Sequence, residues 1–91
     1  MSKHITKKDK EIIIKTFDEK FDGWGIYNIE FVDNAKNIGD CVFIDIEGDW
    51  KHAHGHADYL MEQLGYSCEY TKVTEENGSD WYSATHGYIK A

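Results

Sequence analysis

The chain has 91 residues and a formal charge of −7 at pH 7, which suits one small domain and excludes most large enzyme folds. Apolar residues make up 41% and charged residues 30% of the chain, as in ordinary folded proteins and unlike disordered ones. We therefore expect a single domain over residues 1–91, with residues 1–5 as a flexible N-terminal segment.

The charges are unevenly distributed along the chain. All ten basic residues are lysines; residues 1–22 hold six of them with five acids, whereas residues 23–91 hold four lysines and twelve acids. Direct binding of nucleic acid needs a basic surface that neutralises phosphates, so the sequence argues against DNA or RNA as a direct ligand. The acidic majority of the chain favours a basic protein as the partner.

The sequence contains no sign of a membrane or secretory segment. No apolar run approaches the roughly 20 residues that span a bilayer, and the N-terminal MSKHITKKDK lacks the apolar core of a secretory signal. We expect a cytoplasmic protein with no membrane partner. Cys41 and Cys68 are then expected to be reduced and structural.

The first predicted element is a helix that begins after Thr6. Asp9 stands three residues after Thr6, so the two residues form a capping box. A helical spacing is shared by four apolar residues, Ile13, Ile14, Phe17 and Phe21. Asp22-Gly23 ends this helix.

Two strands are predicted next. Residues 24–32 place Tyr27, Ile29 and Phe31 on one side of the first strand. In residues 41–47 the second strand alternates two sets of side chains, Val42, Ile44 and Ile46 against Phe43, Asp45 and Glu47. This alternation is typical of a strand with one buried face.

A second helix and a hairpin complete the chain. Asp49 is the expected N-cap and Gly65 the expected C-terminal glycine of a helix whose apolar stripe is Trp50, Ala53, Ala57, Leu60, Met61 and Leu64. Residues 66–74 and 80–89 then flank Asn77-Gly78, a strong hairpin signal.

The order helix, hairpin, helix, hairpin predicts an α+β fold. We expect a two-layer sandwich of order αββαββ, in which a four-stranded, mainly antiparallel sheet carries both helices on one face.

The predicted hairpin register assigns side chains to the two faces of the sheet. An Asn77-Gly78 turn pairs Cys68 with Gly87 and Glu69 with His86. The helix-covered face then holds Tyr66, Cys68, Tyr70, Trp81 and Ile89. The opposite face is acidic and aromatic, with His86 on it. With Asp80 from the turn it supplies the candidate partner-binding residues, which are Glu30, Phe43, Asp45, Glu47, Glu69, Asp80, Tyr82 and Tyr88. A one-residue bulge would invert part of this assignment.

The segment His52-Ala-His54-Gly-His56 offers imidazoles for a metal. On a helix only His52 and His56, four residues apart, share a face. A zinc or nickel site would need further ligands such as His86, Asp49 or Glu69. The alternative interpretation is that these are polar residues in the first turns of a helix.

No catalytic residue can be assigned from sequence motifs. Neither a Gly-x-Ser-x-Gly elbow nor a CxxC pair is present. We therefore predict that the protein is not an enzyme.

The leading functional hypothesis is a small acidic inhibitor. It would occupy the surface of a larger basic protein, a nucleic-acid-processing enzyme, nuclease or effector complex. In size, charge and lack of a catalytic motif the chain resembles small acidic anti-defence proteins of phages, such as anti-CRISPRs and DNA mimics, and acidic immunity proteins that neutralise nuclease toxins. A phage-encoded protein would act in the host cytosol. The alternatives are a metal-binding domain or small metalloenzyme using the His52/His56 stripe, and a non-catalytic structural or homodimeric subunit.

Overall fold

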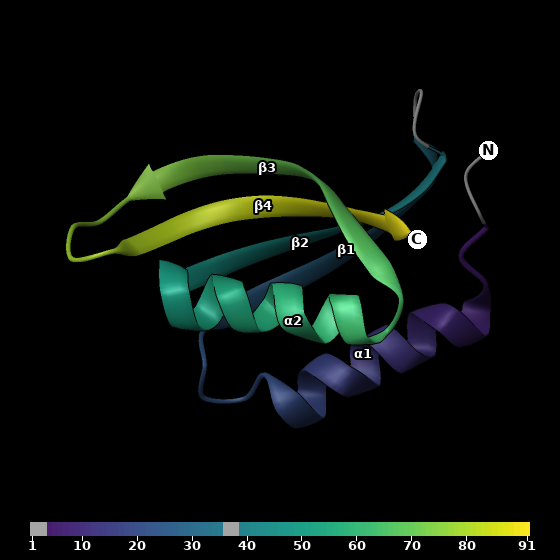
Figure 1. Ribbon diagram of the computed structural model, residues 1–91, viewed down its shortest axis with the longest axis horizontal. Helices are drawn as coiled ribbons and strands as arrows, with labels where there is room; N and C mark the ends of the chain where they lie inside the picture. The colour runs from purple at the N-terminus through teal and green to yellow at the C-terminus, as the bar shows by residue number, and fades with distance from the viewer. Residues whose placement is uncertain (1–3, 36–38) are drawn as a thin grey trace.

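The computed structural model describes residues 4–35 and 39–91. Its elements are α1 (Lys7–Lys20), β1 (Ile26–Ala35), β2 (Gly39–Asp49), η1 (Trp50–His54), α2 (Gly55–Gln63), β3 (Tyr66–Glu76) and β4 (Trp81–Lys90). The strands form one antiparallel sheet of order β1-β2-β4-β3, and both helices lie on the same face of it (Figure 1). This confirms the predicted α+β sandwich. Within the described residues, no helix is long and apolar enough to cross a bilayer.

Helix α1 begins at the predicted capping box. The backbone N–H of Asp9 donates to Thr6 Oγ1 at 3.1 Å, and the N–H of Thr6 donates to Asp9 Oδ2 at 2.8 Å. Phe17 and Phe21 are buried as expected, but the side chain of Ile14 is 44% exposed. Ile14 is about 100° around the helix from buried Ile13, which places it at the border of the core-facing stripe.

The core lies between the two helices and the central strand β2. It is formed by the inward side chains of β2 together with those of α1 and α2, chiefly Val42, Ile44, Ile46, Ile13, Phe17, Ala57 and Met61. The beginning of the second helix sits directly on the sheet, because a Cβ atom at Gly48 would lie only 2.6 Å from Ala53 Cβ. This contact requires glycine in β2.

Asp49 caps the second helix as predicted, but the first turn is π-helical. The N–H of His52 donates to Asp49 Oδ1 at 2.9 Å, and η1 then precedes α2. A π turn contains more residues than an α turn, so the residues before Gly55 are rotated relative to the predicted stripe. His54 is consequently buried, whereas Trp50 is exposed.

The predicted register of the β3–β4 hairpin is wrong. The tight turn is at Ser79-Asp80, where both φ angles are positive (48° and 63°) and Trp81 N–H donates to the Gly78 carbonyl at 2.9 Å. Irregularities between Cys68 and Tyr70 and between Val73 and Glu75 shift the pairing further. The observed partners are Cys68 with Tyr88, Thr71 with His86 and Glu76 with Tyr82.

This register exchanges the faces of β4. Ala84, His86 and Tyr88 are buried under the helices, while the register places Trp81 and Ile89 on the opposite face. The bulge at Cys68/Tyr70 also moves Tyr70 to that opposite face, whereas Tyr66 and Cys68 keep their predicted side.

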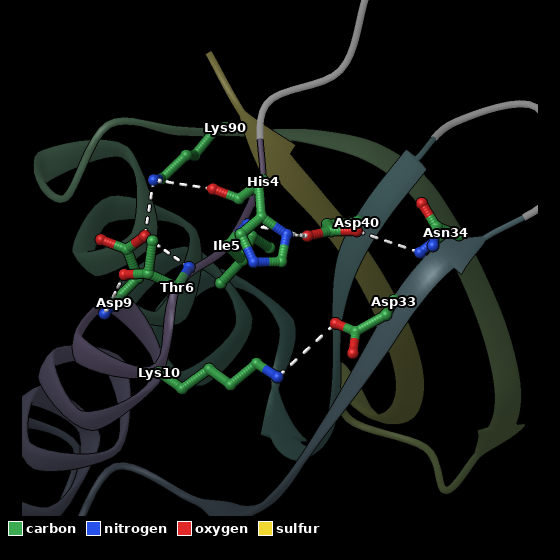
Figure 2. A network of polar contacts seen from close by, with 9 residues as sticks. All are labelled: His4, Ile5, Thr6, Asp9, Lys10, Asp33, Asn34, Asp40 and Lys90. Carbon is green, nitrogen blue, oxygen red and sulfur yellow. Dashed lines mark hydrogen bonds and ion pairs between the residues drawn. The ribbon is translucent and has the colours of Figure 1, made fainter.

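His4 and Ile5 are anchored to the sheet by Asp40 of β2 and Lys90 of β4 (Figure 2). The buried Asp40 carboxylate accepts from the backbone N–H groups of Ile5 at 2.8 Å and Asn34 at 3.0 Å. Lys90 Nζ donates to the His4 carbonyl and to Asp9. Ile5, which falls in the segment expected to be flexible, is thus buried and hydrogen-bonded, and residues 1–3 lie outside the described residues.

Candidate partner-binding face

The face of the sheet opposite the helices, here called the open face, contains a shallow hollow of about 580 Å³. All four strands line it, through Asn28, Glu30, Phe43, Asp45, Glu69, Tyr70, Lys72, Thr74 and Thr85. The structure thus brings together four of the predicted partner-binding residues, Glu30, Phe43, Asp45 and Glu69. Glu47 lies beside Asp45 in an adjacent depression of the sheet.

The floor of the hollow is aromatic. The rings of Phe43 and Tyr70 meet edge to face across β4, with their centroids 6.1 Å apart. Gly87 lies between them, and a Cβ atom there would be 3.0 Å from Phe43 Cε1 and 3.1 Å from Tyr70 Cβ. The missing side chain in β4 therefore lets the two rings approach each other over the strand.

Among its described lining residues, the hollow has three carboxylates and one lysine, Lys72, which forms no ion pair with them. Among the described residues, none of Glu30, Asp45 or Glu69 forms an ion pair with a lysine. Asp45 accepts a hydrogen bond from Thr85 Oγ1, and Glu69 accepts one from Ser67. Both carboxylates are thus held by neutral donors and keep their charge unpaired.

The same imbalance extends over the sheet. The four strands hold nine acids and two lysines, namely Glu30, Asp33, Asp40, Asp45, Glu47, Asp49, Glu69, Glu75 and Glu76 against Lys72 and Lys90. Helix α1 alone holds five lysines, Lys7, Lys8, Lys10, Lys15 and Lys20. The negative field therefore comes from the sheet layer.

Three predicted site residues lie elsewhere. Tyr88 is 1% exposed beneath the helices, and the Tyr82 ring packs against Trp50 at 5.4 Å on the helix side. Asp80 lies in the turn, where its carbonyl accepts from Trp50 N–H at 2.9 Å. The exchanged faces of β4 remove both tyrosines from the open face, and the displaced turn places Asp80 beside η1.

Sequence reasoning missed Tyr70, Lys72 and Thr85 as residues of the hollow. Thr85 could have been found only from the strand order, which pairs it with Asp45 across β2 and β4. Tyr70 and Lys72 depend on the bulge in β3, because it reverses the alternation of side chains after Cys68. No local signal in the sequence marked that bulge.

The three clustered histidines point in different directions. His56 Nε2 bonds to the Lys20 carbonyl at 2.9 Å, and its ring stacks on Trp24 at 4.0 Å. His52 Nδ1 lies 3.2 Å from Asp49, and His54 is buried. In the described part of the chain, no three His, Cys, Asp or Glu side chains are placed to share a metal ion. The structure therefore does not bring His52, His56 and His86 together as one set of ligands.

His54 and His86 form a buried hydrogen-bonded pair, and for neutral rings the neighbouring groups determine which nitrogens carry the protons. His54 Nε2 lies 3.0 Å from the Tyr82 carbonyl, which only accepts, so this nitrogen carries the proton. His54 Nδ1 then accepts from His86 Nε2 at 2.8 Å, which leaves His86 Nδ1 to accept from Thr71 Oγ1 at 3.2 Å. Cys68 Sγ lies 3.4 Å from the same hydroxyl.

This histidine pair holds η1 on β4 and β3 and is poorly suited to general-base catalysis. Burial, together with His54, lowers the pKa of His86 to about 4, so the imidazole is a weak base at neutral pH. The Cys68 thiol reaches His86 only through Thr71. Nearby, the buried Tyr88 hydroxyl has no hydrogen-bond partner among the described residues, and burial raises its pKa.

Comparisons of the chain with protein-family models, with curated proteins and with solved structures found no match. The chemistry of the open face is therefore what indicates a function.

Proposed function

We propose that the protein is a small acidic inhibitor that uses its open face to occupy the basic surface of a larger nucleic-acid-processing enzyme or effector complex. The observation that carries this proposal is the hollow in which Glu30, Asp45 and Glu69 surround the Phe43/Tyr70 floor without a lysine ion pair.

The sheet gives Glu30 and Asp45 a fixed spacing. Glu30 pairs with Phe43 and Asp45 pairs with Thr85, so three neighbouring strands hold them in register. Carboxylates on a rigid sheet can take the place of phosphates against lysine and arginine side chains, and their field accelerates encounter with a basic partner. The aromatic floor supplies the apolar centre that stable interfaces need. Occlusion of the partner's nucleic-acid site would follow from binding alone.

The test uses decalysine as a probe of basic surfaces. We expect its binding to weaken with salt and to shift the NMR signals of the hollow, chiefly those of Phe43, Tyr70 and Thr85. The double variant Glu30→Lys/Asp45→Lys should weaken binding by roughly tenfold or more, since it reverses two charges on the rim. The matched control, Glu11→Lys/Glu19→Lys, changes the net charge equally at two exposed positions of α1.

The two double variants decide between a site and a bulk charge effect. Equal weakening in both would contradict the proposal, as would probe-induced shifts confined to the helices. Concentration-dependent shifts of the open face without any probe would instead point to the homodimeric subunit predicted as an alternative.

A further inference from the structure

Strand β1 forms one edge of the sheet. In the part of the chain that the structure describes, β1 pairs only with β2. The backbone N–H and C=O groups of every second residue point away from β2, so they have no strand partner. Its register is regular from Ile26 to Val32. The opposite edge strand, β3, has two irregularities and a lysine, which are the devices that protect an edge from pairing.

A row of α1 side chains runs along β1 on the helix side. Lys10 Nζ lies 5.5 Å from the Phe31 ring centroid and 3.5 Å from Asp33. Two turns further along α1, Asp18 accepts from the Tyr27 hydroxyl at 2.6 Å. The contacts at both ends show that this row and β1 run side by side in opposite directions.

Ile14 occupies the middle of that row. It is four residues from both Lys10 and Asp18, so it lies beside the centre of β1, where Ile29 faces the helices. Ile29 and Phe31 are only partly buried, and Ile14 is 44% exposed. The edge of β1 thus has an apolar strip on its helix side, made of Ile14, Ile29 and Phe31.

The open side of the same edge carries one carboxylate of β1, Glu30, together with Ile26, Asn28 and Val32. Glu30 and Asn28 line the hollow with Phe43 and Asp45 of β2. Neither β1 nor β2 contains a lysine. A strand beside β1 would therefore meet the Glu30 carboxylate on one side, with Asp45 of β2 behind it, and aliphatic and aromatic groups on the other.

We propose that β1 accepts an additional strand from the partner, an extended segment in which basic and apolar side chains alternate. Successive side chains of a strand point to opposite faces. The basic set would lie beside Glu30 on the open face, and the apolar set would cover Ile14, Ile29 and Phe31. The backbone of the segment would bond to the free edge of β1, as in other cases of strand addition. This proposal rests on the proposed function and specifies how the basic partner is bound.

The test compares two peptides of identical composition. One has lysine and valine in strict alternation over the length of the regular part of β1, and the other has its lysines and valines in two blocks. We expect the alternating peptide to bind roughly tenfold more tightly, because only it satisfies both sides of the edge at once. Two forms of the alternating peptide, N-methylated at alternate sets of amides, should differ in affinity, since only one set of amides faces β1.

The apolar strip has a matched control within α1. Ile14→Asn should weaken binding of the alternating peptide severalfold, whereas Ile12→Asn should leave it unchanged, because Ile12 is 43% exposed but lies about 200° around the helix from Ile14. Both positions are exposed, so both variants should fold.

The outcomes separate the two proposals. Equal binding of the alternating and block peptides, with N-methylated forms that behave alike, would overturn strand addition. If Glu30→Lys/Asp45→Lys still weakened decalysine binding in that case, the proposed function would stand. Absence of salt-dependent binding by any of the basic peptides would overturn both.

Discussion

His86 shows how one buried residue links the fold to pH. Its imidazole is neutral because it is buried against His54, and its two nitrogens are used by His54 and Thr71. A proton on His86 would go to Nδ1, which would then donate to Thr71 Oγ1 instead of accepting from it. The hydrogen bonds can adapt to the charged ring, so it is burial, together with the neighbouring His54, that favours the neutral imidazole.

We expect stability to fall between about pH 6.5 and pH 4. Burial lowers the pKa of His86 from 6.5 to about 4, so within this range the unfolded chain takes up a proton that the folded chain does not. The loss should total roughly 3 kcal/mol at the lower end, measured by urea unfolding at several pH values. The glutamine of His86→Gln cannot titrate. The free energy of unfolding of this variant should therefore be lower than that of the unchanged protein at pH 7, but it should vary less with pH over this range. Equal slopes for both proteins would contradict the assignment.

Asp9 and Asp40 change the stability of the protein at lower pH than His86 does. The hydrogen bond from Lys90 is the largest of the effects that lower the pKa of Asp9 to about 2, and the N–H groups of Asn34 and Ile5 lower that of Asp40. These carboxylates contribute stability above the ordinary value of 3.8, and the contribution is lost as the pH falls below it. The effect of His86 can therefore be measured separately.

Gly48 in β2 and Gly55 in α2 should respond oppositely to substitution by alanine. At Gly48 a Cβ atom would lie 2.6 Å from Ala53 Cβ, so we expect Gly48→Ala to cost about 1–3 kcal/mol. At Gly55, in α2, the nearest atom would be 3.9 Å away. Gly55→Ala should stabilise the protein by roughly 0.5–1 kcal/mol, because alanine is the better helix former. Thermal unfolding of both variants tests these two predictions. If Gly48→Ala did not change the stability, η1 would be able to move off the sheet.

At the scale of elements, the sequence predicted correctly the features that depend on residues close together in the chain. The Thr6/Asp9 capping box and the alternation in β2 are contained within a few residues, and both were confirmed. The faces of β4 were wrong because they depend on the turn at Ser79-Asp80 and on the bulges in β3. Neither follows from Asn77-Gly78, since the sequence allows positive φ at several neighbouring positions.

The candidate site was predictable to the same extent. Glu30, Phe43 and Asp45 lie in regular, paired strands, and alternation alone placed them on the open face. Tyr82 and Tyr88 lie after the turn, so the wrong turn position placed them on the wrong face of the sheet. The inward rotation of His54 could not be foreseen either, because a π turn has no distinct sequence signal here.

The Asp40 carboxylate of β2 joins β1 to the segment before α1, and its removal should lower the stability of the protein. It accepts from the backbone of Ile5 and Asn34, so Asp40→Ala would leave the buried N–H of Ile5 without its partner. We expect a loss of about 1–3 kcal/mol in urea unfolding. Asp33→Ala removes only the exposed Lys10 ion pair and should change stability by less than about 1 kcal/mol. Similar losses in both variants would contradict the importance of the buried bonds.

At the scale of the whole molecule, the acids of the sheet repel one another. Glu30 is exposed and has no lysine in β1 or β2 to balance it. Glu30→Lys should therefore raise the free energy of unfolding at low salt, and the gain should shrink near 1 M salt, where the Debye length is about 3 Å. Unfolding in urea at both salt concentrations measures this. A destabilised variant at low salt would show that Glu30 serves the fold rather than a partner.

The two sides of the hollow also differ in how firmly they are held. Helix α1 supports the β1 side through Tyr27, Phe31 and Asp33. On the β3 side every residue from Cys68 to Glu76 is exposed, and the hairpin extends past the helices (Figure 1). Segments with few buried contacts open locally at lower cost than the whole domain unfolds. The hollow consequently has one rigid wall and one compliant wall, so its width can adjust to partners of different size while Glu30 and Asp45 keep their spacing.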